Sequence, residues 1–239
     1  MGMFDFFMSP EKRMARHVRR LTNRDAQPED RQASAEWLAS EGSPRAILGL
    51  LSRFDMKLDH DIKNSTEIEA MISLVLSLRK DAVEPLKVWL RQCKAVTQPL
   101  EILVQLEGER VAIESCYDIL ARERESGNDF KPAKKRAVLL WLAERRAEDI
   151  VEHAAPFLQD FDEGVRYAAA EAIAAAGDDA GRLPMLEALA DPDEESNRFR
   201  ARICDVFIQR SWTVTERAQD LPEILPTGYQ IRGERIARA

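Results

Sequence analysis

An apolar stripe with helical spacing sets the expected fold class of this 239-residue chain. The stripe consists of Val165, Ala168, Ala169, Ala172, Ile173 and Ala176. These residues recur at intervals of three and four and therefore lie on one face of a helix. The same spacing recurs over 68–75 and 113–120, and no segment shows the sustained alternation typical of strands. The pattern predicts an all-α chain.

Prolines and glycines divide this chain into short helices. Prolines fall in or near the first turns of apolar segments, where the missing N–H costs nothing, at Pro44, Pro85 and Pro184. Glycines lie just beyond apolar stripes, where a left-handed cap is favoured, at Gly42, Gly108 and Gly177. This punctuation predicts helices of about 10 to 18 residues.

The predicted helices group into pairs. After an opening helix at 9–21, antiparallel pairs are expected at 28–53, 65–94, 97–125, 131–160, 162–190 and 194–225. The clearest internal match aligns 162–173 with 193–204, an offset of 31 to 32 residues. A period of about 30 to 40 residues with two helices per unit is typical of an α-solenoid. We therefore expect an amphipathic capping helix at 1–24, a solenoid at 25–225 and a loose basic tail at 226–239 containing Arg232, Arg235 and Arg238.

The segment 155–190 resembles HEAT repeats of the short bacterial type also found in phycobilisome-lyase-like proteins. The features that carry the resemblance are the acidic turn of Asp160 and Asp162, the pair Val165 and Arg166, the turn of Gly177 and Asp178, and Pro184. The resemblance is strongest over 130–212. It departs at Asn197 and Arg198, where a Val-Arg pair is expected, and at insertions over 54–64 and 124–130. It implies a right-handed α-solenoid, an armadillo-like α/α superhelix of about six HEAT-like antiparallel helix pairs.

The same resemblance implies a structural ladder. In such repeats a turn aspartate and an arginine a few residues later bond to their equivalents in the next repeat. Asp162 with Arg166, and Asp193 with Arg198, are the residues in those positions.

Reactive residues are few in the sequence. The cysteines Cys93, Cys116 and Cys204 are widely separated and predict neither a disulfide framework nor a thiolate metal site, which fits a reducing cytoplasm. The chain has three histidines, none in a helical metal-binding pair, and it has no glycine-rich phosphate loop. We therefore expect no catalytic residues, no metal and no cofactor, and so a protein that is not an enzyme.

The strongest local charge lies near the N-terminus. It comprises Lys12, Arg13, Arg16, Arg19, Arg20 and Arg24, with no acid between positions 12 and 24. The segment could bind phosphate, an acidic partner or an anionic membrane surface, with Phe4, Phe6 and Phe7 as an apolar anchor. Alternatively, it caps the exposed end of the solenoid while its arginines face water. The overall charge of −7 argues against a general nucleic-acid binder and leaves only this local cluster open; no specific nucleic acid is expected.

Second helices line the concave face of HEAT solenoids, so their charged residues are the other candidate contacts. The candidate partner-binding residues are Arg13, Arg16 and Arg20 on the opening helix and Lys87, Arg91, Glu148, Asp149 and Glu152 on the solenoid, together with the insertion at 54–64. Lys87 and Arg91 flank Trp89 but lie off its face, so no composed pocket is predicted there.

The leading functional hypothesis is a non-catalytic scaffold or adaptor that binds a protein partner through the solenoid surface. Alternatives are binding of nucleic acid or an anionic membrane surface through the basic helix, a HEAT-like alkylpurine DNA glycosylase, and a bilin lyase subunit. The sequence leaves the partner and the oligomeric state open.

Overall fold

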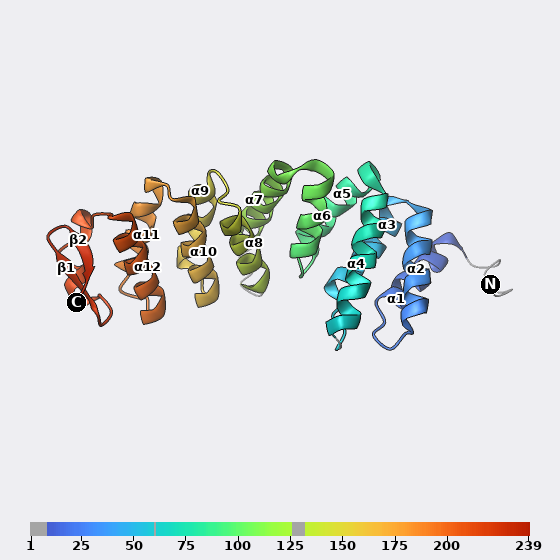
Figure 1. The fold of residues 1–239 in the computed structure, drawn as a ribbon, viewed down its shortest axis with the longest axis horizontal. Coiled ribbons are helices and arrows are strands. Elements are labelled where there is room, and N and C mark those ends of the chain that lie inside the picture. The colour runs from blue at the N-terminus through green and yellow to red at the C-terminus, as the bar shows by residue number, and fades with distance from the viewer. Residues whose placement is uncertain (1–8, 60, 126–131) are drawn as a thin grey trace. The chain divides into compact units, whose positions relative to one another are not determined.

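The computed structural model describes residues 9–59, 61–125 and 132–239 (Figure 1). It comprises two compact units, residues 1–115 and 116–239, whose boundary lies within α7 Glu109–Glu125. The predicted fold class is confirmed: the described chain is an all-α solenoid of successive helices, with one small two-stranded sheet near its C-terminal end. The aromatic residues expected to anchor the N-terminus, and most of the insertion expected at 124–130, lie outside the described residues.

Capping residues mark several helix ends in the first unit. The helices are α1 Pro10–Leu21, α2 Pro28–Glu41, α3 Pro44–Leu51, α4 Asp61–Ser77, α5 Val83–Gln92 and α6 Thr97–Glu107. Ser9 accepts a hydrogen bond from the backbone N–H of Lys12 at the start of α1, and Ser43 accepts one from Ala46 at the start of α3. Between α2 and α3, Gly42 adopts a left-handed φ of 69°, which a glycine tolerates without strain.

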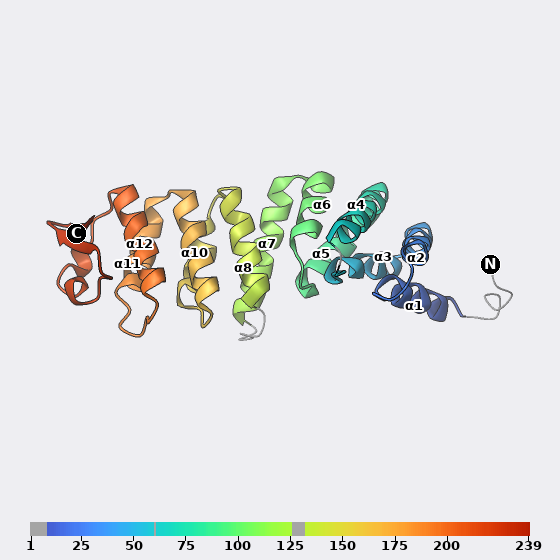
Figure 2. The same ribbon diagram turned by 60° about the horizontal axis from the view of Figure 1, so that its bottom comes forward.

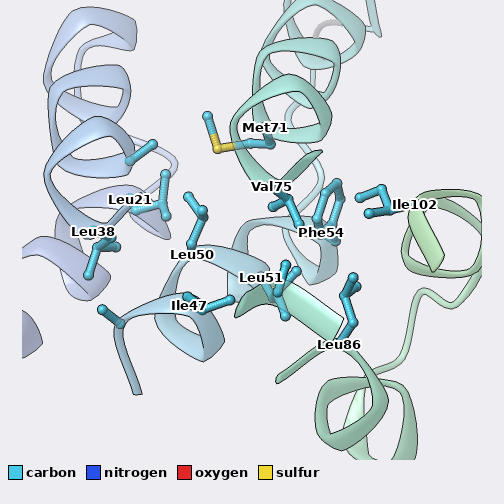
Figure 3. Close-up of a cluster of buried hydrophobic side chains, with 13 residues drawn as sticks. Leu21, Leu38, Ile47, Leu50, Leu51, Phe54, Met71, Val75, Leu86 and Ile102 are labelled. Atoms are coloured by element: carbon cyan, nitrogen blue, oxygen red, sulfur yellow. The ribbon is translucent and has the colours of Figure 1, made fainter. Parts of the chain in front are cut away.

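The core of the first unit receives a buried side chain from each of these six helices (Figure 3). The buried side chains labelled there are Leu21, Leu38, Ile47, Leu50, Leu51, Phe54, Met71, Val75, Leu86 and Ile102. Met14 and Val18 of α1 pack against the same cluster, so α1 covers α2 and α3 as a capping helix would. Gly49 of α3 allows this close approach, because a Cβ there would lie 2.5 Å from Val18 Cγ2.

The second unit contains two layers of helices. Its elements after α7 are α8 Pro132–Glu144, α9 Ile150–Ala154, α10 Glu163–Ala176, α11 Arg182–Leu189, α12 Asn197–Arg210, β1 Tyr229–Arg232 and β2 Arg235–Arg238. The helices α8, α10 and α12 lie side by side in one layer (Figures 1 and 2). The shorter α9 packs against α10, and α11 packs against α12; a 3-10 turn at Ala155–Gln159 contacts α9, α10 and α11.

Most of the apolar stripe on α10 is buried as the sequence predicts: at most 1% of the surface of Val165, Ala168, Ala169, Ala172 and Ile173 is exposed, while Ala176 at the end of the stripe is half-buried. Asp162 caps the helix by accepting the backbone N–H of Val165 at 3.0 Å. Ser196 caps α12 in the same way through the N–H of Phe199. Gly177 ends α10 with a φ of 72°.

Two expectations for the C-terminal region are wrong. The sixth pair has α12 as its first helix, but short 3-10 turns at Thr215–Arg217 and Leu221–Glu223 stand in place of a second α-helix. The tail expected to be loose forms an antiparallel hairpin, with Arg232 opposite Arg235 across a two-residue turn. The hairpin packs on α12: Ile236 is buried, and Tyr229 Oη donates to Asp205 Oδ1 at 2.9 Å.

Candidate interaction surfaces

In two successive repeats, the fourth residue of the first helix is basic. Its side chain bonds to an acid in the turn that precedes the first helix of the next repeat. Arg166, the fourth residue of α10, donates from Nε and Nη2 to Glu194 at 2.7 and 2.9 Å. Lys135, the fourth residue of α8, pairs with Asp160 in the same manner. Both acids are almost fully buried and also accept the backbone N–H of the next helix's capping residue. These cross-repeat bonds therefore belong to the framework.

The predicted ladder is corrected by these bonds. Asp162 serves as a helix cap, and the bonding acid before α12 is Glu194 rather than Asp193. Arg198 lies 4.7 Å from the centre of the Tyr167 ring, whereas Arg200 occupies the fourth position of α12 and donates to the carbonyl oxygen of Asp191. The starts of α10 and α12 are offset by 34 residues, because Ser196 is the counterpart of Asp162. The sequence match of the two acidic turns gave an offset of 31 to 32 residues, which is two to three residues too short.

The first unit contains a related but more deeply buried cluster. Arg31, the fourth residue of α2, donates to Glu67 from Nη2 at 2.5 Å and from Nε at 3.0 Å. Arg53 donates to the same carboxylate at 3.1 Å and holds Asn64 Oδ1 and the carbonyl oxygen of Met56. Only 4% of Arg31 and none of Arg53 is exposed, and sequence reasoning missed all three charged residues.

Two arginines on one acid shift the ionisation of this cluster. Burial by itself raises the pKa of Glu67, but hydrogen bonds from Arg31 and Arg53 outweigh it and leave the pKa below its usual value. Burial lowers the pKa of Arg53, and the bond to Glu67 opposes that effect. The negative charge of Glu67 offsets the free-energy cost of burying the guanidinium groups of Arg31 and Arg53.

The predicted contacts on the second unit cluster at one edge. Glu148 and Asp149 line a hollow with Arg146, Ala147, Ile150, Val151, Ala176 and Asp178. Glu152 follows on α9 and is exposed. Among the described residues, no ion pair engages Glu148, Asp149, Glu152 or Asp178. We call these four carboxylates the acidic edge. Asp178 and Arg146 were missed as members of this site, because only folding brings 146–151 and 176–178 together.

The turn that forms this hollow is held in an uncommon backbone conformation. Arg146 and Asp149 have φ values of 48° and 59°, a region that costs non-glycine residues about 1 to 3 kcal/mol each. Tyr117 Oη donates to the carbonyl oxygen of Glu148, and its ring stacks on His153 at 3.7 Å. Burial and the nearby Asp149 charge raise the pKa of Tyr117 to about 12, so the phenol remains a donor at neutral pH.

The two candidates on α5 lie on its surface. Lys87 pairs with Glu84 one turn away at 3.1 Å, and Arg91 is exposed. Trp89 packs against the core of the first unit.

The arginines of α1 divide between two environments. Arg13 lies 6.0 Å from the ring of Trp37, on which His17 stacks at 4.2 Å. Arg16 and Arg20 line a second hollow with Arg19, Asn23, Ala26 and Asp30. Arg20 and Asp30 form an ion pair at 3.7 Å. We call this second hollow the arginine hollow.

The thiols are not reactive candidates in this fold. All three cysteines are buried, and burial raises the pKa of Cys204 to about 12 and that of Cys116 well above its usual value. Across 9–59, 61–125 and 132–239, no group of three or more histidine, cysteine or carboxylate side chains is placed to hold a metal ion. Nor does any helix of that part of the chain have the length and apolar character needed to cross a bilayer.

Residues 125–204 match the family model for HEAT repeats. The match covers less than half of the chain and falls on the segment whose helices are joined by the cross-repeat bonds. It supports the HEAT-repeat resemblance at the level of the repeat. Comparison with curated proteins and with solved structures finds no match.

Proposed function

We propose that this protein is a non-catalytic scaffold that binds a protein partner, and that the acidic edge of the second unit is a contact surface. The proposal rests on one contrast within the unit. Buried framework acids such as Asp160 and Glu194 are bonded to basic residues of the fold. Glu148, Asp149, Glu152 and Asp178 form no ion pair with any described residue, although they lie around one hollow or on the helix that follows it. HEAT repeats commonly present such surfaces to other proteins.

The chemistry of this edge favours a basic partner segment. Lysine or arginine side chains would complement the carboxylates, while Ile150, Val151 and Ala176 supply apolar contact in the hollow. The hydrogen bond from Tyr117 to the carbonyl oxygen of Glu148 constrains this turn, which favours binding because less backbone freedom is lost on association. Charge of this kind contributes mainly to the association rate and to partner choice.

The test is affinity capture from nuclease-treated lysate of the source cells with three proteins. These are the wild-type chain, the double variant Glu148→Lys with Glu152→Lys, and the matched control Asp193→Lys with Glu195→Lys. Both variants change the charge equally, and the control residues are exposed on another turn of the same unit.

We expect a stoichiometric protein partner with the wild type and the control, and its loss with the Glu148 and Glu152 variant. Retention by all three proteins would place the contact elsewhere on the solenoid. Repeated failure to capture any stoichiometric partner would contradict the scaffold function itself.

A further inference from the structure

Three arginines of α1 face one hollow beside the turn that joins α1 to α2. Arg16, Arg19 and Arg20 are spaced at i, i+3 and i+4, so their side chains share one helical face. Asn23, Ala26 and Asp30 complete the lining. The hollow measures about 380 Å³, roughly the volume of a dozen water molecules at ~30 Å³ each. A phosphate group with ordered water fits that space.

The positive charge of the hollow exceeds its negative charge. Asp30 is the acid in the lining, and its pair with Arg20 spans 3.7 Å with 57% of the Asp30 side chain exposed. Because exposed ion pairs of that length are weak, Asp30 neutralises the charge of Arg20 only weakly. The negative end of α1 favours Arg19 and Arg20 in its last turn. A bound anion would add negative charge beside these two guanidinium groups, within reach of Arg16 in the same lining.

The turn that borders the hollow is arranged to tolerate an anion. Carbonyl oxygens repel anions, yet those of Asn23, Arg24 and Ala26 all accept hydrogen bonds from Arg31 Nη1. Glu67 fixes Arg31 in turn. The 14-residue helix α2 begins immediately after this turn, and no side chain caps its N-terminus. The positive end of the α2 dipole therefore adds to the field of the three guanidinium groups.

We propose that the arginine hollow binds a phosphate group, with Arg16, Arg19 and Arg20 as its ligands. Guanidinium groups present paired N–H donors that match phosphate oxygens, which makes arginine the preferred residue for such a site. The site lies in the first unit and is independent of the acidic edge. A failed test here leaves the scaffold function untouched, and the reverse also holds.

The first test measures binding of inorganic pyrophosphate by calorimetry at low ionic strength. The variant Arg16→Gln with Arg19→Gln should bind at least tenfold more weakly, because charge-assisted hydrogen bonds are lost. The matched control Arg110→Gln with Arg122→Gln removes two exposed arginines of α7 and should bind like the wild type. Glutamine preserves helix propensity, and circular dichroism verifies that every variant is folded.

A second pair of variants separates a site from diffuse charge. Asp30→Asn removes the carboxylate of the lining and should tighten binding several-fold. Asp25→Asn makes the same charge change five residues away, outside the lining, and should leave binding unchanged. Equal effects of the two variants would overturn the proposal, as would equal losses in the two double arginine variants.

Vesicles then identify the source of the phosphate. Phosphatidic acid presents a phosphomonoester, whereas phosphatidylglycerol presents only a diester. Pyrophosphate binding without sedimentation on either vesicle supports a soluble phosphate ligand, and Arg19-dependent sedimentation on phosphatidic acid alone supports a lipid headgroup. Equal sedimentation on both vesicles, or no binding of either probe, would refute a phosphate site.

Discussion

Replacing Glu67 by glutamine should destabilise the first unit strongly. The carboxylate accepts three hydrogen bonds of 3.1 Å or less from Arg31 and Arg53, whose side chains are 4% and 0% exposed. Glutamine keeps the shape but removes the charge that balances two buried guanidinium ions. Breaking a buried ion pair by removing one partner costs about 3 to 5 kcal/mol. That is a large share of the ~5 to 15 kcal/mol that stabilises a typical domain.

Urea unfolding at pH 7, followed by tryptophan fluorescence, measures this effect. A background with Trp141→Phe and Trp212→Phe leaves Trp37 and Trp89, both in the first unit, as the reporters. The control Glu84→Gln removes an exposed acid paired with Lys87 and should cost at most about 0.5 kcal/mol. A loss below about 1 kcal/mol for Glu67→Gln would refute the reasoning.

The pH dependence gives an independent check on Glu67. Its folded-state pKa is depressed, so its contribution is fully present above the unfolded-state pKa of about 4.3 and is lost as the pH falls through the folded-state pKa. The difference in stability between wild type and Glu67→Gln should therefore shrink as the pH falls below about 4. A difference that stays constant from pH 7 to pH 3 would contradict the assigned charge state.

Three further predictions follow from the packing. Arg166→Ala should lower the free energy of unfolding by about 2 to 3 kcal/mol, since it strands a buried acid, whereas Arg198→Ala should cost less than about 1 kcal/mol; chemical denaturation distinguishes them. Gly49→Ala should loosen α1 from α3 by forcing a clash with Val18, and hydrogen exchange should show faster opening of α1 with little change in the second unit. Cys204 should resist thiol reagents in the native protein at pH 8 and react in urea, because burial holds its pKa near 12.

Local signals predicted many helix ends because these depend on neighbouring residues, although α3, α9 and α11 are shorter than the expected length of about 10 to 18 residues. Ser43 with Pro44 starts α3 and Gly42 ends α2, and both positions follow from capping chemistry in the sequence. The stripe beginning at Val165 is buried because a helical period requires a buried face in a stack of helices.

Other features depended on choices between similar local signals. The turns before α10 and α12 are both rich in acids, so matching identical residue types paired Asp162 with Asp193. The structural counterpart of Asp162 is the capping residue Ser196, which gives the offset of 34. The hairpin had a usable signal in the Gly233-Glu234 turn between Ile231 and Ile236. Its strands are only four residues long, so their alternation was too short to stand out.

The candidate surfaces were only partly predictable. Runs of charge pointed to Arg16, Arg20, Glu148 and Asp149, but nothing in the sequence shows which charges are balanced by residues distant in the chain. The pairing of Arg31 with Glu67, for example, spans 36 positions. Distant pairings of this kind arise from packing, and a single sequence does not encode them as a local pattern.

The cross-repeat bonds have a consequence for how such a chain can lengthen. The segment 163–196 contains Arg166, its acceptor Glu194 and the serine that caps the next helix. The charge pair of the joint thus lies within one module, and Arg166 also donates to the carbonyl oxygens of Asp160 and Phe161 just before it. A tandem duplication of this module would add a layer without leaving a buried charge unbalanced, whereas a deletion within its last turn would break the joint. We therefore expect the solenoid to tolerate the gain or loss of this whole module better than the loss of one residue from the turn that holds Glu194 and Ser196.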